Sequence, residues 1–190
     1  MNDRPRGRRS VPPPEKTSPE IHLDVRAQSR RWHELGKLPN LRALLNEALE
    51  AGIAVAPRKP MSGAELSLLL TDDKRIRAVN RDWRGFDKAT NVLSFPAAPP
   101  ERIARSPLLG DIVIAYETVL REAEAESKSV TDHLRHLAIH GLLHLLGEDH
   151  ENEAEARRME ALEIAALARL GVADPYAGAE LVTASVPSSA

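Results

Sequence analysis

The pattern of apolar and polar residues predicts four short strands in the first part of the chain. The segment from Ile21 to Val25 alternates with a period of two, which places one face of a strand on a core. Three later apolar runs of similar length are bounded by polar or turn-forming residues. They predict further strands at 65–70, 91–95 and 109–114.

Helical spacing of apolar residues predicts the remaining elements. Asn40 is a suitable N-cap for a helix whose apolar residues recur every three or four positions and which ends at Gly52. Asp72 or Asp73 is expected to cap a short helix after the second strand. From Tyr116 onward the pattern is helical throughout, with segments near 116–128, 131–146 and 152–170.

Together these elements predict an α/β (α+β) fold. We expect a single domain over residues 20–176, in which a small mixed four-stranded sheet is covered by helices and the C-terminal half is helical. Residues 1–19 are rich in Arg and Pro and have almost no apolar anchors, and residues 177–190 are similar in character. Both ends are therefore expected to be disordered.

The composition excludes several classes of function. The chain has 190 residues and no cysteine, which excludes disulfides, thiolate zinc fingers, iron–sulfur clusters and cysteine nucleophiles. A net charge of −2 and an aromatic content of 3% argue against a module that binds nucleic acid by base stacking. Because no apolar run approaches the length of a membrane helix and no signal peptide is recognisable, we expect a cytoplasmic protein without membrane contact.

Three histidines near the end of the predicted helix 131–146 carry the strongest chemical signal. His140 and His144 are four residues apart, so both imidazoles leave the same helix face one turn apart. Gly147 can adopt the left-handed conformation that ends a helix, and the chain can then bring His150 back to the same point. Three imidazoles without thiolates are typical of a catalytic metal site with a position for water.

The histidine spacing equals that of the H-E-x-x-H-x-x-G-x-x-H signature of metzincin peptidases, with one difference. Gly141 replaces the glutamate that acts as the base in those enzymes. One alternative is therefore a zinc peptidase whose base has moved to a carboxylate of the following turn, namely Glu148, Asp149 or Glu151.

The other residues around the motif are expected to be structural. Met159 is expected to pack in the core, and His133 and His136 continue the helical stripe upstream. For His136 a second-shell role, in which it orients a metal ligand, is the alternative. A solvated acidic helix face is expected for four glutamates, Glu153, Glu155, Glu160 and Glu163.

A second candidate group lies in the loop that joins the short helix to the third strand. Arg84 and Lys88 are the cations of this loop, and we expect them to bind substrate. A guanidinium at Arg84 can hold a phosphate through two hydrogen bonds and stabilise the charge that develops during phosphoryl transfer, which would make it catalytic. The alternative is a surface ion pair between Arg84 and Asp82 or Asp87.

The two groups together resemble the YbeY family of metal-dependent endoribonucleases, also called ribosomal RNA maturation factors. The resemblance covers about residues 20–176 and depends most on the histidine motif combined with Thr-Asn-Val-Leu-Ser-Phe-Pro at 90–96. It implies a functional arginine at Arg84 and one zinc ion per chain. The ligands that it implies are His140, His144 and His150.

The resemblance also implies a biological role. It implies cleavage of single-stranded RNA, maturation of the 3′ end of small-subunit ribosomal RNA and ribosome quality control, with ribosomal RNA and small-subunit proteins as partners. A non-catalytic ribosome-assembly factor with a structural metal is a further alternative. Glu148 and Ala89 differ from the family, which usually has an aromatic residue and proline there. We expect Glu148 to add negative charge where an RNA phosphate approaches.

Overall fold

Four strands form one mixed sheet, as predicted, and their order is β1-β2-β4-β3. The computed structural model describes residues 18–35 and 38–177, so the ends predicted to be disordered lie almost entirely outside it. Strands β1, β2 and β4 are parallel, and β3 is an edge strand antiparallel to β4. The strands are β1 Ile21–Ala27, β2 Ala64–Thr71, β3 Val92–Pro96 and β4 Leu108–Ala115.

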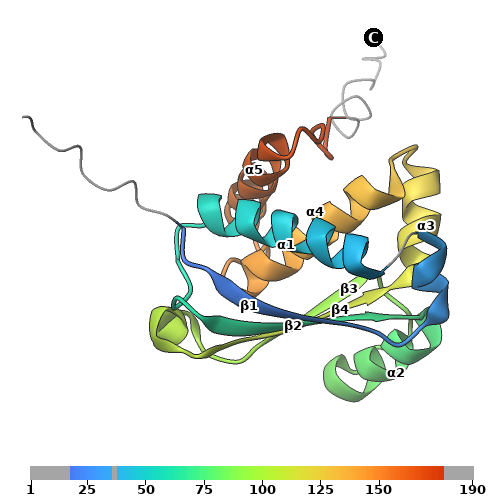
Figure 1. The fold of residues 1–190 in the computed structure, drawn as a ribbon, viewed down its shortest axis with the longest axis horizontal. Helices are drawn as coiled ribbons and strands as arrows, with labels where there is room; N and C mark the ends of the chain where they lie inside the picture. The colour runs from blue at the N-terminus through green and yellow to red at the C-terminus, as the bar shows by residue number, and fades with distance from the viewer. Residues whose placement is uncertain (1–17, 36–37, 178–190) are drawn as a thin grey trace, which may run out of the picture.

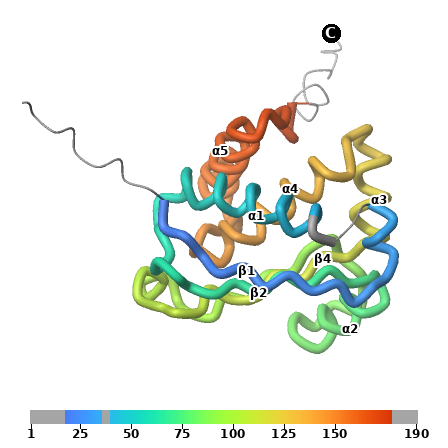
Figure 2. The backbone as a smooth tube through the Cα atoms, in the orientation of Figure 1, coloured from blue at the N-terminus to red at the C-terminus, as the bar shows by residue number. Residues whose placement is uncertain are grey.

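The helices cover both faces of this sheet unequally. Helices α1, α4 and α5 lie on one face and α2 lies on the other (Figure 1). The chain passes from β1 through α1 into β2, which lies beside β1 and runs parallel to it (Figure 2). The helices are α1 Leu38–Val55, α2 Asp73–Arg84, α3 Tyr116–Ala125, α4 Val130–Leu145 and α5 Glu153–Arg169.

Two short 3-10 helices, Arg30–Leu35 and Pro100–Arg105, were not expected from the sequence pattern. The first buries Trp32, whose indole N–H donates to the carbonyl of Thr71 at 2.8 Å. Among the helices of the described residues, none combines the length and the apolar composition that a bilayer span requires.

The main core lies between the sheet and the three helices α1, α4 and α5. Helix α4 approaches the sheet closely because Gly141 has no side chain. A Cβ atom there would lie 3.0 Å from Ser94 Oγ and 3.1 Å from Ile112 Cγ2. This approach places the C-terminal end of α4 against β3, the edge of the sheet. The buried side chains include Leu45, Leu49, Leu66, Leu68, Ile112 and Leu142.

A smaller core on the opposite face holds α2 in place. It consists of Ile76, Leu93, Val113 and Ala115. Helix α2 begins at an Asp72 N-cap, and Gly85 follows its last residue with a φ of 76°. The end of α2 and the end of α4 therefore lie on opposite faces of the sheet, with the edge strand β3 between them.

Candidate metal centre

The turn after α4 determines where the third histidine lies. Gly147 has a φ of 79°, the left-handed conformation that its position predicts. Its N–H donates to the carbonyl of His144 at 2.9 Å, and the N–H of Glu148 donates to the carbonyl of Leu143 at 2.9 Å. This pair of bonds is a Schellman motif, which reverses the direction of the chain. Residues 148–150 are thereby brought back beside the last turn of the helix.

The three histidine side chains converge, as the sequence predicts. The ring centroids of His140 and His144 are 4.6 Å apart, and that of His150 lies 5.6 Å and 5.0 Å from them. One ring nitrogen of each histidine lies within 4.8 Å of those of the other two. Within the described residues this is the one group of three or more His, Cys, Asp or Glu side chains arranged to hold a metal ion, and it contains no fourth protein ligand.

Hydrogen bonds on the outer side of two rings show that the site fits a cation. His140 Nδ1 lies 2.7 Å from Glu163 Oε1, and His144 Nδ1 lies 3.1 Å from the carbonyl oxygen of Glu148. Because both oxygens accept, each Nδ1 carries the proton and each Nε2 presents a lone pair. The two Nε2 atoms face each other at 3.1 Å. Lone pairs at this distance repel unless they share a cation, and two nitrogens on one zinc ion would be about 3.3 Å apart.

The prediction of a solvated acidic face is wrong for Glu163. Its side chain is 1% exposed and accepts hydrogen bonds from His140 Nδ1, His136 Nε2 and the hydroxyl of Tyr176. The charge can be buried because these three groups surround it. A carboxylate on the far nitrogen of a metal-binding imidazole fixes the ring and makes it more basic. The other three glutamates are exposed or partly exposed as predicted, namely Glu153, Glu155 and Glu160.

His136 acts on the histidine cluster only through Glu163. Its Nε2 lies 2.7 Å from Glu163 Oε2, while Glu163 Oε1 binds His140. His133, the neighbouring histidine, is buried and binds Glu122 Oε2 at 2.8 Å, which is a structural role. Met159 is buried in the main core, as predicted.

Burial and hydrogen bonding set the charges at the site. Burial alone would raise the pKa of Glu163, but hydrogen bonds from His136 and His140 lower it to about 2. Burial, together with the charges of His140 and His150, lowers the pKa of His144 to about 4. Burial and the Glu163 carboxylate raise the pKa of Tyr176. At neutral pH Glu163 is therefore an anion and His144 is neutral, the form that binds metal.

Glu148 lies at the cleft as expected, and two arginines compensate the negative charge that it was expected to add there. The Glu148 side chain is 5% exposed, with Oε1 3.0 Å from Arg58 Nη1 and Oε2 3.1 Å from Arg158 Nε. Arg58 also donates to the carbonyl of Gly147 at 2.9 Å. Through these ion pairs, the carboxylate connects the turn after α4 with α5 and with the segment after α1.

The histidines open into a cleft of about 840 Å³ that crosses the free edge of the sheet. Its walls are the end of α2, the edge strand β3 and the turn after α4. Arg84, the last residue of α2, lines the cleft together with His140, His144 and His150. Lys88 is exposed on the following loop and does not line it. The structure therefore brings one of the two predicted substrate-binding cations to the histidines.

The alternative role of Arg84 in a surface ion pair is not observed. Asp82 accepts a hydrogen bond from Arg81 at 2.8 Å, and Asp87 accepts two from Arg77 at 2.8 Å. None of the ion pairs within the described part of the chain includes Arg84. Its guanidinium is therefore available to an anion in the cleft.

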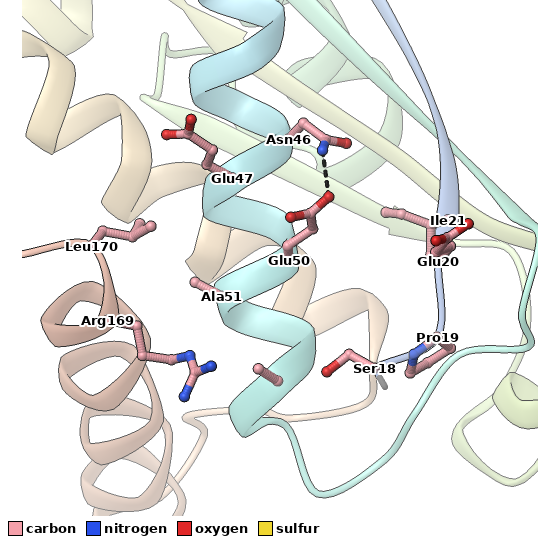
Figure 3. Close-up of a pocket in the computed structure, with 11 residues that line it drawn as sticks. Ser18, Pro19, Glu20, Ile21, Asn46, Glu47, Glu50, Ala51, Arg169 and Leu170 are labelled. Carbon is pink, nitrogen blue, oxygen red and sulfur yellow. Dashed lines mark hydrogen bonds between the residues drawn. The ribbon is translucent and has the colours of Figure 1, made fainter. Parts of the chain in front are cut away.

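A second large hollow lies away from this centre, between the start of β1, α1 and the end of α5 (Figure 3). Its volume is about 810 Å³. Glu47 and Glu50 of α1 and Arg169 line it, and Glu50 accepts a hydrogen bond from Asn46 at 2.6 Å. It contains none of the three histidines, so the cleft at β3 is the candidate functional site.

Comparison with known proteins gives the family of the chain. A sequence model described as Endoribonuclease YbeY matches residues 27–171. The chain belongs to the YbeY endoribonuclease family. It is 48% identical to Endoribonuclease YbeY of Azorhizobium caulinodans, over 83% of this chain and 97% of that protein. The corresponding protein of Agrobacterium fabrum is 53% identical over 85% of this chain and 96% of its own. As a member of this family, the chain is a metal-dependent hydrolase.

Position 141, where metzincin peptidases have their glutamate, lies against the sheet. Position 141 faces Ser94 and Ile112 at close range, so a glutamate side chain would be directed into the sheet. The carboxylate of Glu148 is already bound by two arginines. Asp149 Oδ1 accepts the backbone N–H of His150 at 2.8 Å and lies 4.0 Å from His144 Nδ1. Glu151, the third candidate, is exposed and lines the cleft. The family of the chain therefore argues against a peptidase more strongly than the turn itself does.

Proposed function

We propose that this YbeY-family chain is a zinc-dependent endoribonuclease that cleaves single-stranded RNA. The observation that carries the proposal is the opening of three convergent imidazoles into the same cleft as Arg84, an arginine outside the ion pairs of the described residues. A phosphodiester that enters this cleft meets a metal site on one side and a guanidinium on the other.

Zinc is the ion that the donor set favours. His140, His144 and His150 would hold one ion per chain, and three nitrogen donors without a fourth protein ligand are typical of catalytic rather than structural zinc. Bound there, zinc supplies a Lewis acid for a phosphoryl oxygen and hydroxide at neutral pH. This donor set therefore argues against the alternative of a non-catalytic factor with a structural metal.

The chain's own residues have distinct roles in this proposal. Arg84 is the catalytic residue that binds the scissile phosphate and stabilises its growing negative charge. Lys88 binds the RNA strand farther along, outside the cleft. Glu163 holds His140 in the orientation and tautomer that bind metal, and His136 in turn holds Glu163.

We further propose ribosomal RNA as the substrate, with action at the 3′ end of the small-subunit RNA and in ribosome quality control. The resemblance of the sequence motifs to the YbeY family supports this assignment. The net charge of −2 gives no general attraction to RNA, so small-subunit ribosomal proteins are the proposed means of recruitment. Such a substrate would place the protein in the cytoplasm.

Two substitutions test the proposed function. His144→Ala is expected to purify without zinc by elemental analysis. Arg84→Ala is expected to retain zinc and to cleave an unstructured RNA at least about tenfold more slowly, because a charge-assisted contact to the phosphate is lost. The matched controls are His33→Ala, an exposed histidine outside the cluster, and Arg81→Ala, which is already paired with Asp82.

Three outcomes would contradict the proposal. Stoichiometric zinc in His144→Ala would show that His144 is not a zinc ligand. If Arg84→Ala cleaves RNA as fast as the Arg81→Ala control, Arg84 is a surface charge without a catalytic role. Equal cleavage of base-paired and unpaired RNA would refute the preference for single strands.

A further inference from the structure

The most exposed large apolar side chain of the described residues lies at the mouth of the cleft. Trp83 is 75% exposed, although it is in the last turn of a well-formed helix. The chain's other tryptophan, Trp32, is fully buried and hydrogen-bonded. An indole exposed to this extent loses the gain from burial, which suggests that a ligand covers it.

Trp83 is held in position but remains open to solvent. Its ring packs against the ring of Phe95 on the edge strand β3, with centroids 5.8 Å apart and planes inclined by 60°. Both residues line the cleft that contains the three histidines. The indole is thus positioned by the sheet edge, and most of its surface is exposed at the lining of the cleft.

The charges around Trp83 favour a nucleotide as its ligand. The two nearest carboxylates in sequence, Asp82 and Asp87, are each bound by an arginine of α2, which compensates their charge. Arg84, the residue that follows Trp83, is not part of an ion pair within the described residues. An aromatic surface beside an available guanidinium is the combination that binds a base and its phosphate in single-stranded nucleic acids.

We propose that Trp83 stacks on an unpaired base of the RNA whose phosphate is bound by Arg84. This inference rests on the proposed function and adds the base-binding part of the site. In a duplex, both faces of every internal base are stacked on neighbours, so a stacking residue at the cleft favours unpaired RNA. The low aromatic content of the chain does not prevent this, because one indole at the right place is sufficient.

Tryptophan fluorescence measures this contact directly, because Trp32 is buried and Trp83 is exposed. The measurement uses the full chain with His144→Ala, which should bind RNA without cleaving it, and a short single-stranded oligoadenylate as the probe. Binding is expected to quench the emission of Trp83. An oligomer of the same length without bases is expected to bind with little quenching, since it supplies phosphates only.

Substitution of Trp83 in the same background separates stacking from electrostatic attraction. Trp83→Ala is expected to raise the Kd for oligoadenylate at least about fivefold, and Trp83→Phe, which keeps an aromatic face, by less than about twofold. Phe86→Ala is the matched control, because Phe86 is 56% exposed on the loop that follows α2 but does not line the cleft. The Kd for these variants is measured with a fluorescent label on the RNA.

Several results would overturn the proposal. Equal Kd values for Trp83→Ala and the parent would do so, and would leave a protein partner as the ligand of the indole. An equal loss of affinity in Phe86→Ala would show that RNA binds a general apolar patch and not a specific subsite in the cleft. If the wild-type chain does not cleave RNA but Trp83→Ala still weakens binding, the proposed function fails and this inference stands.

Discussion

At the scale of single residues, a buried carboxylate is the centre of the hydrogen bonds around the site. Glu163 on α5 binds two histidines of α4 and Tyr176 near the end of the described chain. Its low pKa means that the carboxylate stays ionised at every pH at which the histidines can bind metal. The orientation of His140 therefore depends on a residue that does not itself bind the ion.

Replacement of this carboxylate should weaken metal binding without removing any ligand. We expect Glu163→Gln to lower zinc affinity by about 10- to 100-fold, because the amide is neutral and can accept through only one of its two polar atoms. The affinity is measured by competition with a chromophoric chelator. Glu155→Gln, an exposed glutamate of the same helix, is the control and should bind zinc like the wild type. Equal zinc affinities for the two variants would show that Glu163 does not contribute to metal binding.

The position of Glu163 in the helical pattern of α5 indicates that it is buried, although its charge favours an exposed position. Glu163 is four residues after Met159 and three before Ala166, so it occupies the buried face of α5. Glutamate is seldom fully buried unless it is paired, so a glutamate at a core position indicates a partner. Glu148 gives no such signal: Arg158 is ten residues away, but Arg58 is 90 residues away and only the folded chain brings it close.

At the scale of elements, the turn after α4 contributes as much as the helix itself to bringing the three histidines together. Gly147 adopts a positive φ, and a Cβ there would lie 2.9 Å from Cβ and Cγ of Pro100. The helix supplies two imidazoles by its period alone, whereas the third depends on this turn. The chain can bring His150 back only if position 147 has no side chain.

Gly147→Ala should therefore reduce both stability and metal binding. We expect a loss of about 1–2 kcal/mol in the free energy of unfolding, from the left-handed conformation, with further loss from the contact with Pro100. Gly171→Ala is a matched control: Gly171 has a φ of 70° after α5, and a Cβ there meets nothing within 4 Å. Both variants should lose stability in urea unfolding, but only Gly147→Ala should lose zinc affinity. Normal zinc affinity in Gly147→Ala would contradict the role of the turn.

Local pattern predicts most strands and helices well but predicts the ends of α1 and the irregular segments poorly. The helix expected to begin after Asn40 and end at Gly52 runs from Leu38 to Val55, so Asn40 is not its N-cap and Gly52 lies inside it. The strand predicted at 65–70 is observed at Ala64–Thr71, and the helix predicted at 131–146 is observed at Val130–Leu145. The 3-10 helix Arg30–Leu35 has no clear apolar period, and the tertiary burial of Trp32 fixes it. Its position therefore depends on contacts with distant parts of the chain.

At the scale of the whole molecule, Glu122 connects three elements. It lies on α3 and accepts hydrogen bonds from Asn91, which precedes β3, at 3.0 Å and from His133 of α4 at 2.8 Å. Burial alone would raise its pKa, but the bonds from His133 and Asn91 lower it below the ordinary value. Folding thus favours the ionised form, so this contribution is present above the pKa of the unfolded chain, near 4.5, and is lost as the pH falls through the folded pKa.

Glu122→Gln should therefore make the protein less stable and its stability less sensitive to acid. We expect a loss of about 1.5–3 kcal/mol at pH 7, the range for hydrogen bonds to charged groups, and a smaller decrease below pH 4.5 than in the wild type. Urea unfolding at several pH values, followed by circular dichroism, measures both. Glu124→Gln, exposed on the same helix, is the control. An acid decrease in Glu122→Gln as steep as in this control would contradict the assignment.

The position of the cleft depends on the order of the strands, which local patterns do not determine. β3 follows β2 in the chain but pairs with β4, and this places it at the free edge. Only then do the ends of α2 and α4 meet across one strand. The sequence therefore predicts Arg84 and the three histidines as separate groups, and a family resemblance or the folded structure is needed to join them.

All three donors at the centre are imidazole nitrogens, and the chain has no cysteine. Peroxide releases metal from thiolate sites because it oxidises sulfur, a reaction that imidazole ligands do not undergo in this way. A metal held by these three imidazoles would therefore not be released by oxidation of its ligands, so peroxide would not control this centre as it controls thiolate sites.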